Sequence, residues 1–236
     1  NAGGTVTADS GGSMAFTDIS GEAIDLTATV MISGTSLATP TNTAIANDIV
    51  LDAGGIIDVT TVTANGDVDM TAGGTLTVDT LSGEILTLAA VQAINLGTVA
   101  GLELEATGSS IDFSNALAGS GSVTLVSTSG NINFGSITSS GDVNLDANAD
   151  IVADTIDAGA MLSASAANDM ILNEVLGQQI NLAAGRIVDL NSLDGSSVAV
   201  TAGTALLGSI GANNVSVSAG LIDISGGTGS NSIDLQ

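Results

Sequence analysis

Residues 68–96, VDMTAGGTLTVDTLSGEILTLAAVQAINL, contain an apolar–polar–apolar triplet four times. Val68-Asp69-Met70 recurs as Leu86-Thr87-Leu88, and Leu76-Thr77-Val78 recurs at the same step as Ile94-Asn95-Leu96. Successive side chains of a β-strand point to opposite faces, so the two apolar residues of each triplet share one face. The stretch therefore predicts two short strands in a repeating unit of about 18 residues.

The repeat extends along the whole chain. Its first triplet begins at residues 6, 24, 49, 68, 86, 102, 123, 143, 162, 180, 198, 215 and 233. A third apolar position, such as Leu81, follows the second triplet, and Gly, Asn, Asp and Ser between the apolar segments are typical of corners. We therefore expect an all-β, right-handed parallel β-helix (β-solenoid) of about twelve coils of about 19 residues, triangular in cross-section.

We expect one repeat domain over residues 1–236, because no linker or change of composition divides the chain. The longest step between first triplets runs from Ile24 to Ile49, and this interval contains Pro40, the only proline. Proline cannot donate a hydrogen bond to a sheet, so it favours a loop outside the coil. We predict a loop excursion at residues 34–46.

Composition excludes several functions. The formal net charge of −24 would repel nucleic acid and anionic membrane surfaces, and no apolar run approaches the ~20 residues of a membrane-spanning helix. The chain has no His and no Cys, which excludes a Ser/His/Asp triad, a thiol nucleophile and a His- or Cys-based zinc site. We expect no enzymatic activity, no nucleic-acid partner and no membrane insertion.

Segments such as Gly74-Thr75-Leu76-Thr77-Val78 and Gly130-Asn131-Ile132-Asn133-Phe134, recurring in a chain without Cys, resemble the repeats of filamentous-haemagglutinin-like adhesins. Members of that family are giant right-handed β-helices exported by two-partner secretion. The resemblance covers nearly the whole chain. It implies a secreted or cell-surface fibre that contacts host cells, neighbouring cells or matrix.

One segment has the spacing of oxygen ligands for calcium, the only cofactor the sequence suggests. Asp146, Asn148 and Asp150 alternate as they would in a calcium loop, but Ile151 stands where such a loop has Gly, and no bidentate Glu follows. A plain polar corner is the favoured interpretation, and calcium stays an alternative.

A second candidate is a contact surface. Outward positions of the second strand are polar in the first half of the chain, as at Asp58 and Thr77. In four later coils the same alternation places apolar residues at these outward positions: Val152, Ile171, Val188 and Leu207. Stacked one strand spacing apart, these four would form an exposed apolar stripe. We predict a lateral interface there, the alternative being a register shift of one residue.

These observations favour a structural and adhesive rod of a secreted fibre, with partners stacked end to end. An alternative is a short protomer that assembles end to end into an extracellular filament. Two less favoured alternatives are a polysaccharide-degrading β-helix, which would need paired carboxylates, and an ice-binding face. The latter needs a regular ladder of outward Thr, whereas Thr7, Thr77, Thr87 and Thr124 are scattered in sequence.

Overall fold

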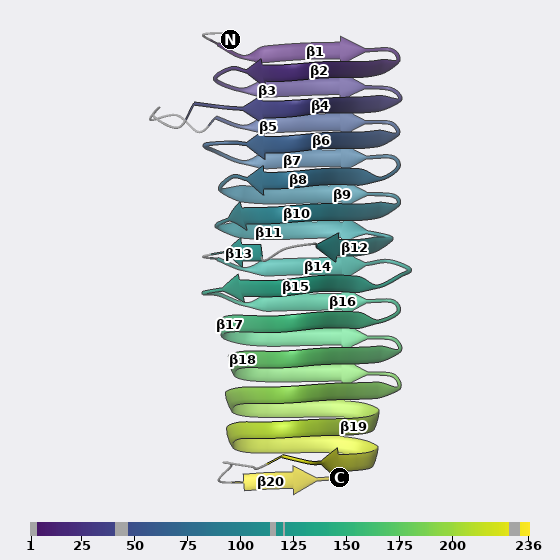
Figure 1. Ribbon diagram of the computed structural model, residues 1–236, viewed down its shortest axis with the longest axis vertical. Coiled ribbons are helices and arrows are strands. Elements are labelled where there is room, and N and C mark those ends of the chain that lie inside the picture. Colours follow the sequence, from purple (N-terminus) through teal and green to yellow (C-terminus); the bar gives the residue numbers. More distant parts are fainter. Residues whose placement is uncertain (1–3, 41–46, 114–116, 120, 227–231) are drawn as a thin grey trace.

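The structure is a computed structural model that describes residues 4–40, 47–113, 117–119, 121–226 and 232–236. In this part of the chain the strands form a right-handed parallel β-solenoid of about 11 turns with a spacing of about 19 residues, without helix. Figure 1 shows the coils stacked one above another, with the termini at opposite ends of the stack. The predicted fold class is confirmed, with about one turn fewer than expected.

The described residues form 20 strands, of which the long strands near the C-terminus wind through several corners without a break. They are β1 (Val6–Ser10), β2 (Ser13–Ser20), β3 (Ile24–Ala28), β4 (Met31–Ala38), β5 (Ile49–Ala53), β6 (Ile56–Thr63), β7 (Val68–Ala72), β8 (Leu76–Ser82), β9 (Ile85–Ala90), β10 (Ala93–Gly101), β11 (Glu103–Gly108), β12 (Ser110–Phe113), β13 (Leu117–Gly119), β14 (Val123–Ser127), β15 (Ile132–Ser139), β16 (Val143–Ala147), β17 (Ile151–Ala166), β18 (Asp169–Ala184), β19 (Ile187–Ile224) and β20 (Ser232–Leu235).

The first segment of each coil belongs to one continuous parallel sheet. β1 pairs with β3, β3 with β5, β5 with β7 and β7 with β9, and the series continues through β11, β14 and β16 into the second half of β17. Each pair joins residues one repeat apart, as in Val68 with Leu86. Each interior coil is therefore hydrogen-bonded to the coil before it and the coil after it, about 4.8 Å apart.

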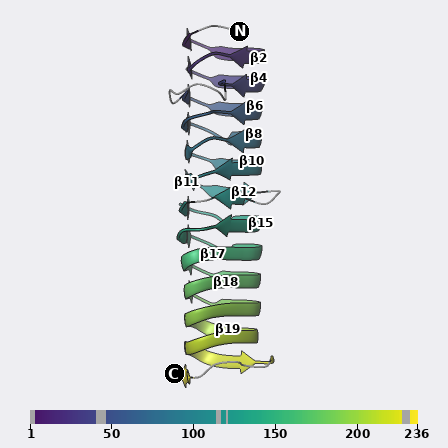
Figure 2. The same ribbon diagram turned by 90° about the vertical axis from the view of Figure 1, so that its left-hand side faces the viewer.

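The second and third segments of a coil lie on one strand that turns a corner. In β6, Val59 and Val62 are both buried although they are three residues apart, whereas a flat strand buries every second residue. The pairing of β6 with β8 also passes over Thr60. Figure 2 views the stack from the side on which β2, β4, β6 and β8 end. Three inward faces per turn give the triangular cross-section.

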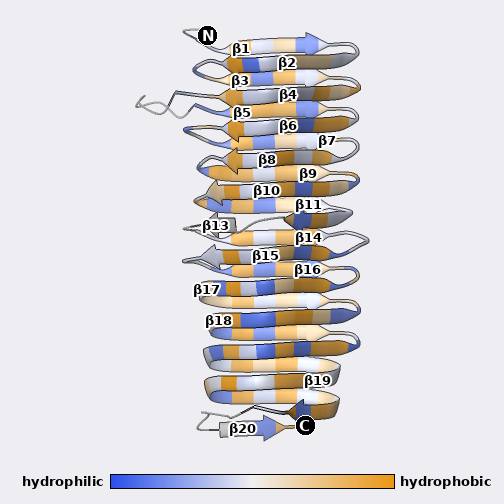
Figure 3. Ribbon diagram, in the orientation of Figure 1, coloured by the Kyte–Doolittle hydropathy of each residue, from blue (hydrophilic) through white to orange (hydrophobic). Residues whose placement is uncertain are grey.

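The core consists of columns of aliphatic side chains that stack from coil to coil. Full burial of one such side chain stabilises the fold by roughly 1.5–3 kcal/mol. Figure 3 shows the resulting alternation of hydrophobic and hydrophilic bands along the strands. One column, 0% exposed throughout, contains Ile57, Leu76, Ile94, Ile111, Ile132, Ile151, Met170 and Val188.

The chain has three phenylalanines, of which Phe113 and Phe134 are buried and Phe16 is partly buried against the core. Phe113 and Phe134 are in register on β12 and β15, with ring centroids 6.3 Å apart and planes tilted by 60°. The ring of Phe16 occupies the space where a side chain on Gly34, its register partner, would begin. Aromatic packing is thus confined to a few coils.

The predicted loop excursion at 34–46 is wrong in its first residues, because Gly34 to Ala38 belong to β4, which pairs with β6. Residues 41–46 lie outside the described residues, so the rest of the excursion stays a prediction. Two buried polar residues, Thr39 and Asn47, are joined by hydrogen bonds. Thr39 donates its hydroxyl to the carbonyl of Asn47 (3.0 Å), and Asn47 donates its side-chain amide to the carbonyl of Pro40 (3.2 Å). Buried polar groups need such partners.

One triplet of the predicted series is out of register. Leu102 was expected to point inward, but it is 52% exposed, and β11 begins at Glu103. Leu104 and Ala106 take the inward positions, opposite Leu86 and Leu88. Shifting a strand by an even number of residues keeps its apolar set on the same face, which is why the alternation alone did not reveal the shift.

Candidate functional site

Two of the four residues of the predicted stripe lie on the surface. Val152 and Ile171 are register partners, 38% and 48% exposed. They line a shallow depression of about 300 Å³ together with Asp154, Asn173, Asp189 and Asn191. A contact made by this pair remains a prediction.

The other two residues contradict the prediction, because Val188 and Leu207 are buried, 0% and 2% exposed. The register partner of Ile171 is Asp189, and Val188 instead pairs with the buried Met170. A shift of one residue moves a side chain from the surface to the core. The four-residue apolar stripe therefore does not exist, and the aspartate limits the surface patch on one side.

Two of the three calcium candidates are engaged in coil-to-coil hydrogen bonds. Asn148 donates its side-chain amide to the carbonyl of Thr128 (2.8 Å), and a carboxylate oxygen of Asp150 accepts the backbone N–H of Asp169 (3.1 Å). Asp146 points outward from β16. Within the part of the chain that the structure describes, no group of three or more His, Cys, Asp or Glu residues is placed to hold a metal ion.

Asp and Asn side chains form short ladders at two corners, a role that the sequence analysis missed. Asp48 accepts the backbone N–H of Asp67 (3.0 Å), and Asp67 accepts that of Ile85 (3.1 Å). At a second corner, Asn131 accepts the N–H of Asp150 (3.1 Å), which in turn accepts from Asp169. Part of the acidic composition therefore satisfies the backbone where coils turn.

The only cation of the chain lies beside the second ladder. The guanidinium of Arg186 is 3.6 Å from a carboxylate oxygen of Asp169, and its side chain is 65% exposed. An ion pair in this setting contributes little to stability. The rest of the rod surface carries acidic charge without side-chain cations.

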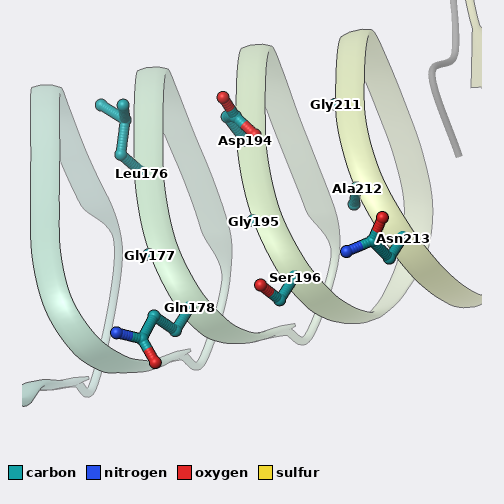
Figure 4. A pocket seen from close by; sticks show the side chains of 9 residues that line it. All are labelled: Leu176, Gly177, Gln178, Asp194, Gly195, Ser196, Gly211, Ala212 and Asn213. Carbon is teal, nitrogen blue, oxygen red and sulfur yellow. The ribbon is translucent and has the colours of Figure 1, made fainter.

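A shallow trough crosses three coils of β18 and β19, with a volume of about 420 Å³. Figure 4 shows its residues in three rows parallel to the axis of the rod. The middle row is Gly177, Gly195 and Ala212; one rim is Leu176, Asp194 and Gly211, and the other is Gln178, Ser196 and Asn213.

Close approach of neighbouring coils explains the glycine floor. A Cβ on Gly195 would lie 2.7 Å from the carbonyl oxygen of Gly177, and one on Gly177 would lie 3.2 Å from the side chain of Ile180. A Cβ in this row points toward the core, as that of the buried Ala212 does, so the row adds no side chain to the outer surface between the two rims. The rims place a hydroxyl, a carboxylate and two amides beside the floor, and Gln178 is oriented by donating to the carbonyl of Gly159 (3.0 Å).

This arrangement can accept and donate hydrogen bonds, but it holds a single carboxylate, Asp194. A glycosidase of the usual kind needs two carboxylates facing each other across the bond that is cleaved. The sequence analysis missed the trough. Its signal is a small residue followed by a polar one in three successive coils, at Gly177-Gln178, Gly195-Ser196 and Ala212-Asn213.

The fold places the chain in the class of β-solenoid repeat proteins. No protein-family model, no curated protein and no solved structure matches the chain. Over the described residues, no helix is long and apolar enough to cross a membrane.

Proposed function

We propose that the chain is a structural and adhesive rod segment of a secreted or cell-surface fibre, similar to those of filamentous-haemagglutinin-like adhesins. The observation that carries the proposal is the continuous parallel pairing from coil to coil, from β1 to β20. Such a stack resists bending because every coil is hydrogen-bonded to its neighbours around its perimeter. The mechanism is mechanical: the rod sets a distance and presents a surface.

The charge distribution supports an extracellular role. The core is aliphatic, whereas the carboxylates lie on the outside or at corners, and the net charge is −24. Repulsion of this size keeps parallel rods apart and is screened over ~8 Å at physiological salt. The same charge disfavours nucleic acid and anionic membranes as partners.

End-to-end stacking is the partner mode that the geometry favours. In the described residues β1 pairs with β3 and β20 pairs with β19, so each terminal strand has one edge that is unpaired. An unpaired edge is a template for a further strand. Continuing repeats of the same polypeptide would complete these edges. A second copy would do so equally well, which keeps the self-assembling protomer as a second candidate.

The absence of catalysis is part of the proposal. Its support is the chemistry of the surface: the trough has one carboxylate, and the two shallow depressions that carry two aspartates, Asp154 with Asp189 and Asp189 with Asp223, are lined by no aromatic residue and no side-chain cation. The chain has no His or Cys to serve as a base or a thiol nucleophile. Turnover of a polysaccharide by the purified protein would overturn this part.

The rod function predicts that length depends on whole coils. Leu162 pairs with Ile180 and Ile180 with Val198, so deletion of residues 162–179 removes one coil and deletion of 162–197 removes two. We expect both variants to fold, with rods shorter by about 5 and 10 Å. Small-angle scattering and electron microscopy of the purified proteins measure this.

Deletion of residues 162–170 is the matched control. It joins Met161 to Ile171 and removes half a coil, so that strands and corners meet in the wrong register. We expect loss of the cooperative unfolding transition or aggregation. A half-coil variant that folds as well as the whole-coil variants, or whole-coil variants that do not shorten, would contradict the proposed rod.

A further inference from the structure

We propose that the trough of β18 and β19 binds an extended, uncharged oligosaccharide of β-1,4-linked hexopyranose units. The inference rests on the proposed function and assigns its adhesive contact to a place. Ligand sites commonly enclose about 300–1,000 Å³ with a few placed polar groups, and the trough, at about 420 Å³, falls within this range.

The rows of the trough repeat with the coil. Leu176 is in register with Asp194, and Gly177 is in register with Gly195, so equivalent positions recur about 4.8 Å apart. One hexopyranose unit of an extended chain has nearly this length. A saccharide chain lying along the floor would therefore present a new hydroxyl to each coil, opposite Gln178, Ser196 and Asn213 in turn.

The backbone of these coils is not open to a peptide partner. Gly177 and Gly195 lie in the continuous pairing of β18 with β19, so their strands already have neighbours on the axis of the stack. Addition of a β-strand needs an unpaired edge, which the trough does not provide. Recognition must use the side chains of the rims, and amides, hydroxyls and carboxylates are the groups that bind sugar hydroxyls.

Charge selects the class of saccharide. The carboxylate of Asp194 is exposed on one rim, and the chain carries 25 acidic residues against one basic residue. An acidic polysaccharide would be repelled by this field, whereas a neutral one donates hydroxyl hydrogen bonds to the carboxylate. Leu176 is half-buried on the same rim and offers an apolar surface to a pyranose ring.

The test uses isotope-labelled full chain and four probes: cellotetraose, mannotetraose, tetra-N-acetylchitotetraose and, as the anionic counterpart, a β-1,4-linked tetramannuronate. We expect at least one neutral probe to shift the backbone amide signals of Gly177, Gly195 and Ala212 with a Kd on the order of 1 mM. The anionic probe should bind at least about fivefold more weakly.

Variants of the rims locate the site. Asp194→Ala should weaken binding about tenfold, because a hydrogen bond to a charged group is lost. Gly211→Leu should abolish it by filling the trough, since a Cβ there meets only the flexible carboxylate of Asp194 at 3.3 Å and no backbone closer than 3.9 Å. If Gly211→Leu does not fold, Ser196→Ala, at an exposed position, should weaken binding about threefold.

Asp189→Ala is the control, because Asp189 is an exposed aspartate of the same coil on another face. It should leave the Kd unchanged. The proposal is overturned if no neutral probe shifts the trough amides, if the shifts lie elsewhere, or if Asp189→Ala weakens binding as much as Asp194→Ala. Rod length in the coil-deletion series is measured without saccharide, so a failure of this site and a failure of the rod are distinguishable.

Discussion

The coils from β3 to β10 and the coils of β17 to β19 have the same architecture, but they differ in how clearly their sequence defines it. In the second segment of the earlier coils an outward polar residue separates two inward ones, as Asp58 does between Ile57 and Val59. In the later coils Val152 and Ile171 occupy outward positions between buried neighbours. The fold thus tolerates apolar residues outside as long as the inward column is complete.

The difference shows what fixes the register of a coil. Pairs such as Ile187-Val188 and Leu206-Leu207 fit either parity of a strand, so local alternation does not choose between them. The choice is made by the column: Val188 stacks on Met170 in a series of fully buried residues. Four predictions test this contrast between inward and outward positions.

The largest difference in stability is expected between a charge placed at an inward, buried position and a charge placed at an outward, exposed position. Val188→Asp puts a carboxylate into the fully buried column and should lower the free energy of unfolding by at least about 4 kcal/mol, or prevent folding. Ile171→Asp, at a position 48% exposed, should cost less than about 1 kcal/mol. Guanidinium unfolding followed by circular dichroism measures both, and similar losses would contradict the register.

Aromatic packing should differ between an interior coil and one near the end of the described stack. Phe134→Ala, which removes a ring packed on Phe113, should lower the free energy of unfolding by about 3 kcal/mol. Phe16→Ala should cost less than half as much, because Phe16 is only half-buried. The same unfolding assay applies, with Phe134→Leu as a milder control. Equal losses for the two alanine variants would argue against graded packing.

The difference in unfolding free energy between alanine variants of a buried and an exposed asparagine should be smaller. Asn47→Ala removes the amide that donates to the carbonyl of Pro40 in a place where Asn47 is 2% exposed, which should cost about 1–3 kcal/mol. Asn148→Ala removes a bond on the exposed side of a corner and should cost under about 0.5 kcal/mol. Thermal unfolding of the two variants, compared at equal concentration, provides the measurement. A larger loss of unfolding free energy for Asn148→Ala than for Asn47→Ala would contradict the buried hydrogen bonds of Thr39 and Asn47.

The smallest effect is expected at the single cation. Arg186→Gln should change the free energy of unfolding by less than about 1 kcal/mol, because the ion pair is long (3.6 Å) and the guanidinium is largely exposed, although the side chain of Asp169 is only 23% exposed. The same change removes the only trypsin site, so the unfolded variant should stay intact with trypsin while the unfolded parent gives two fragments. Cleavage by a Glu-specific protease is the control that both chains are unfolded. A loss of stability well beyond that of an exposed ion pair would mean that Arg186 supports the Asp ladder.

The amino-acid sequence predicts the fold wherever the repeat pattern recurs, but not the register of a strand that only its neighbouring coils determine. Residues one repeat apart predict the length of the repeat and the number of strand segments per coil. They also predict the third inward position of each coil, such as Val62 and Leu81. The failure at Val188 had a usable signal, since Val188-Asp189-Leu190 is itself a triplet one repeat after Met170-Ile171-Leu172. The sequence signal for the trough is weaker, because a glycine indicates a turn as readily as it indicates the middle row of a trough.

Thr39 and Asn47 hold together the two ends of the segment that interrupts the coil between β4 and β5. Thr39 also accepts the backbone N–H of Asn65 (2.9 Å), which ties this junction to the following coil. These bonds fix the chain at Thr39 and at Asn47, on both sides of residues 41–46. In engineering terms this is an insertion site: a foreign epitope or a small domain placed between Pro40 and Asn47 should leave the pairing of β3 with β5 and of β4 with β6 intact.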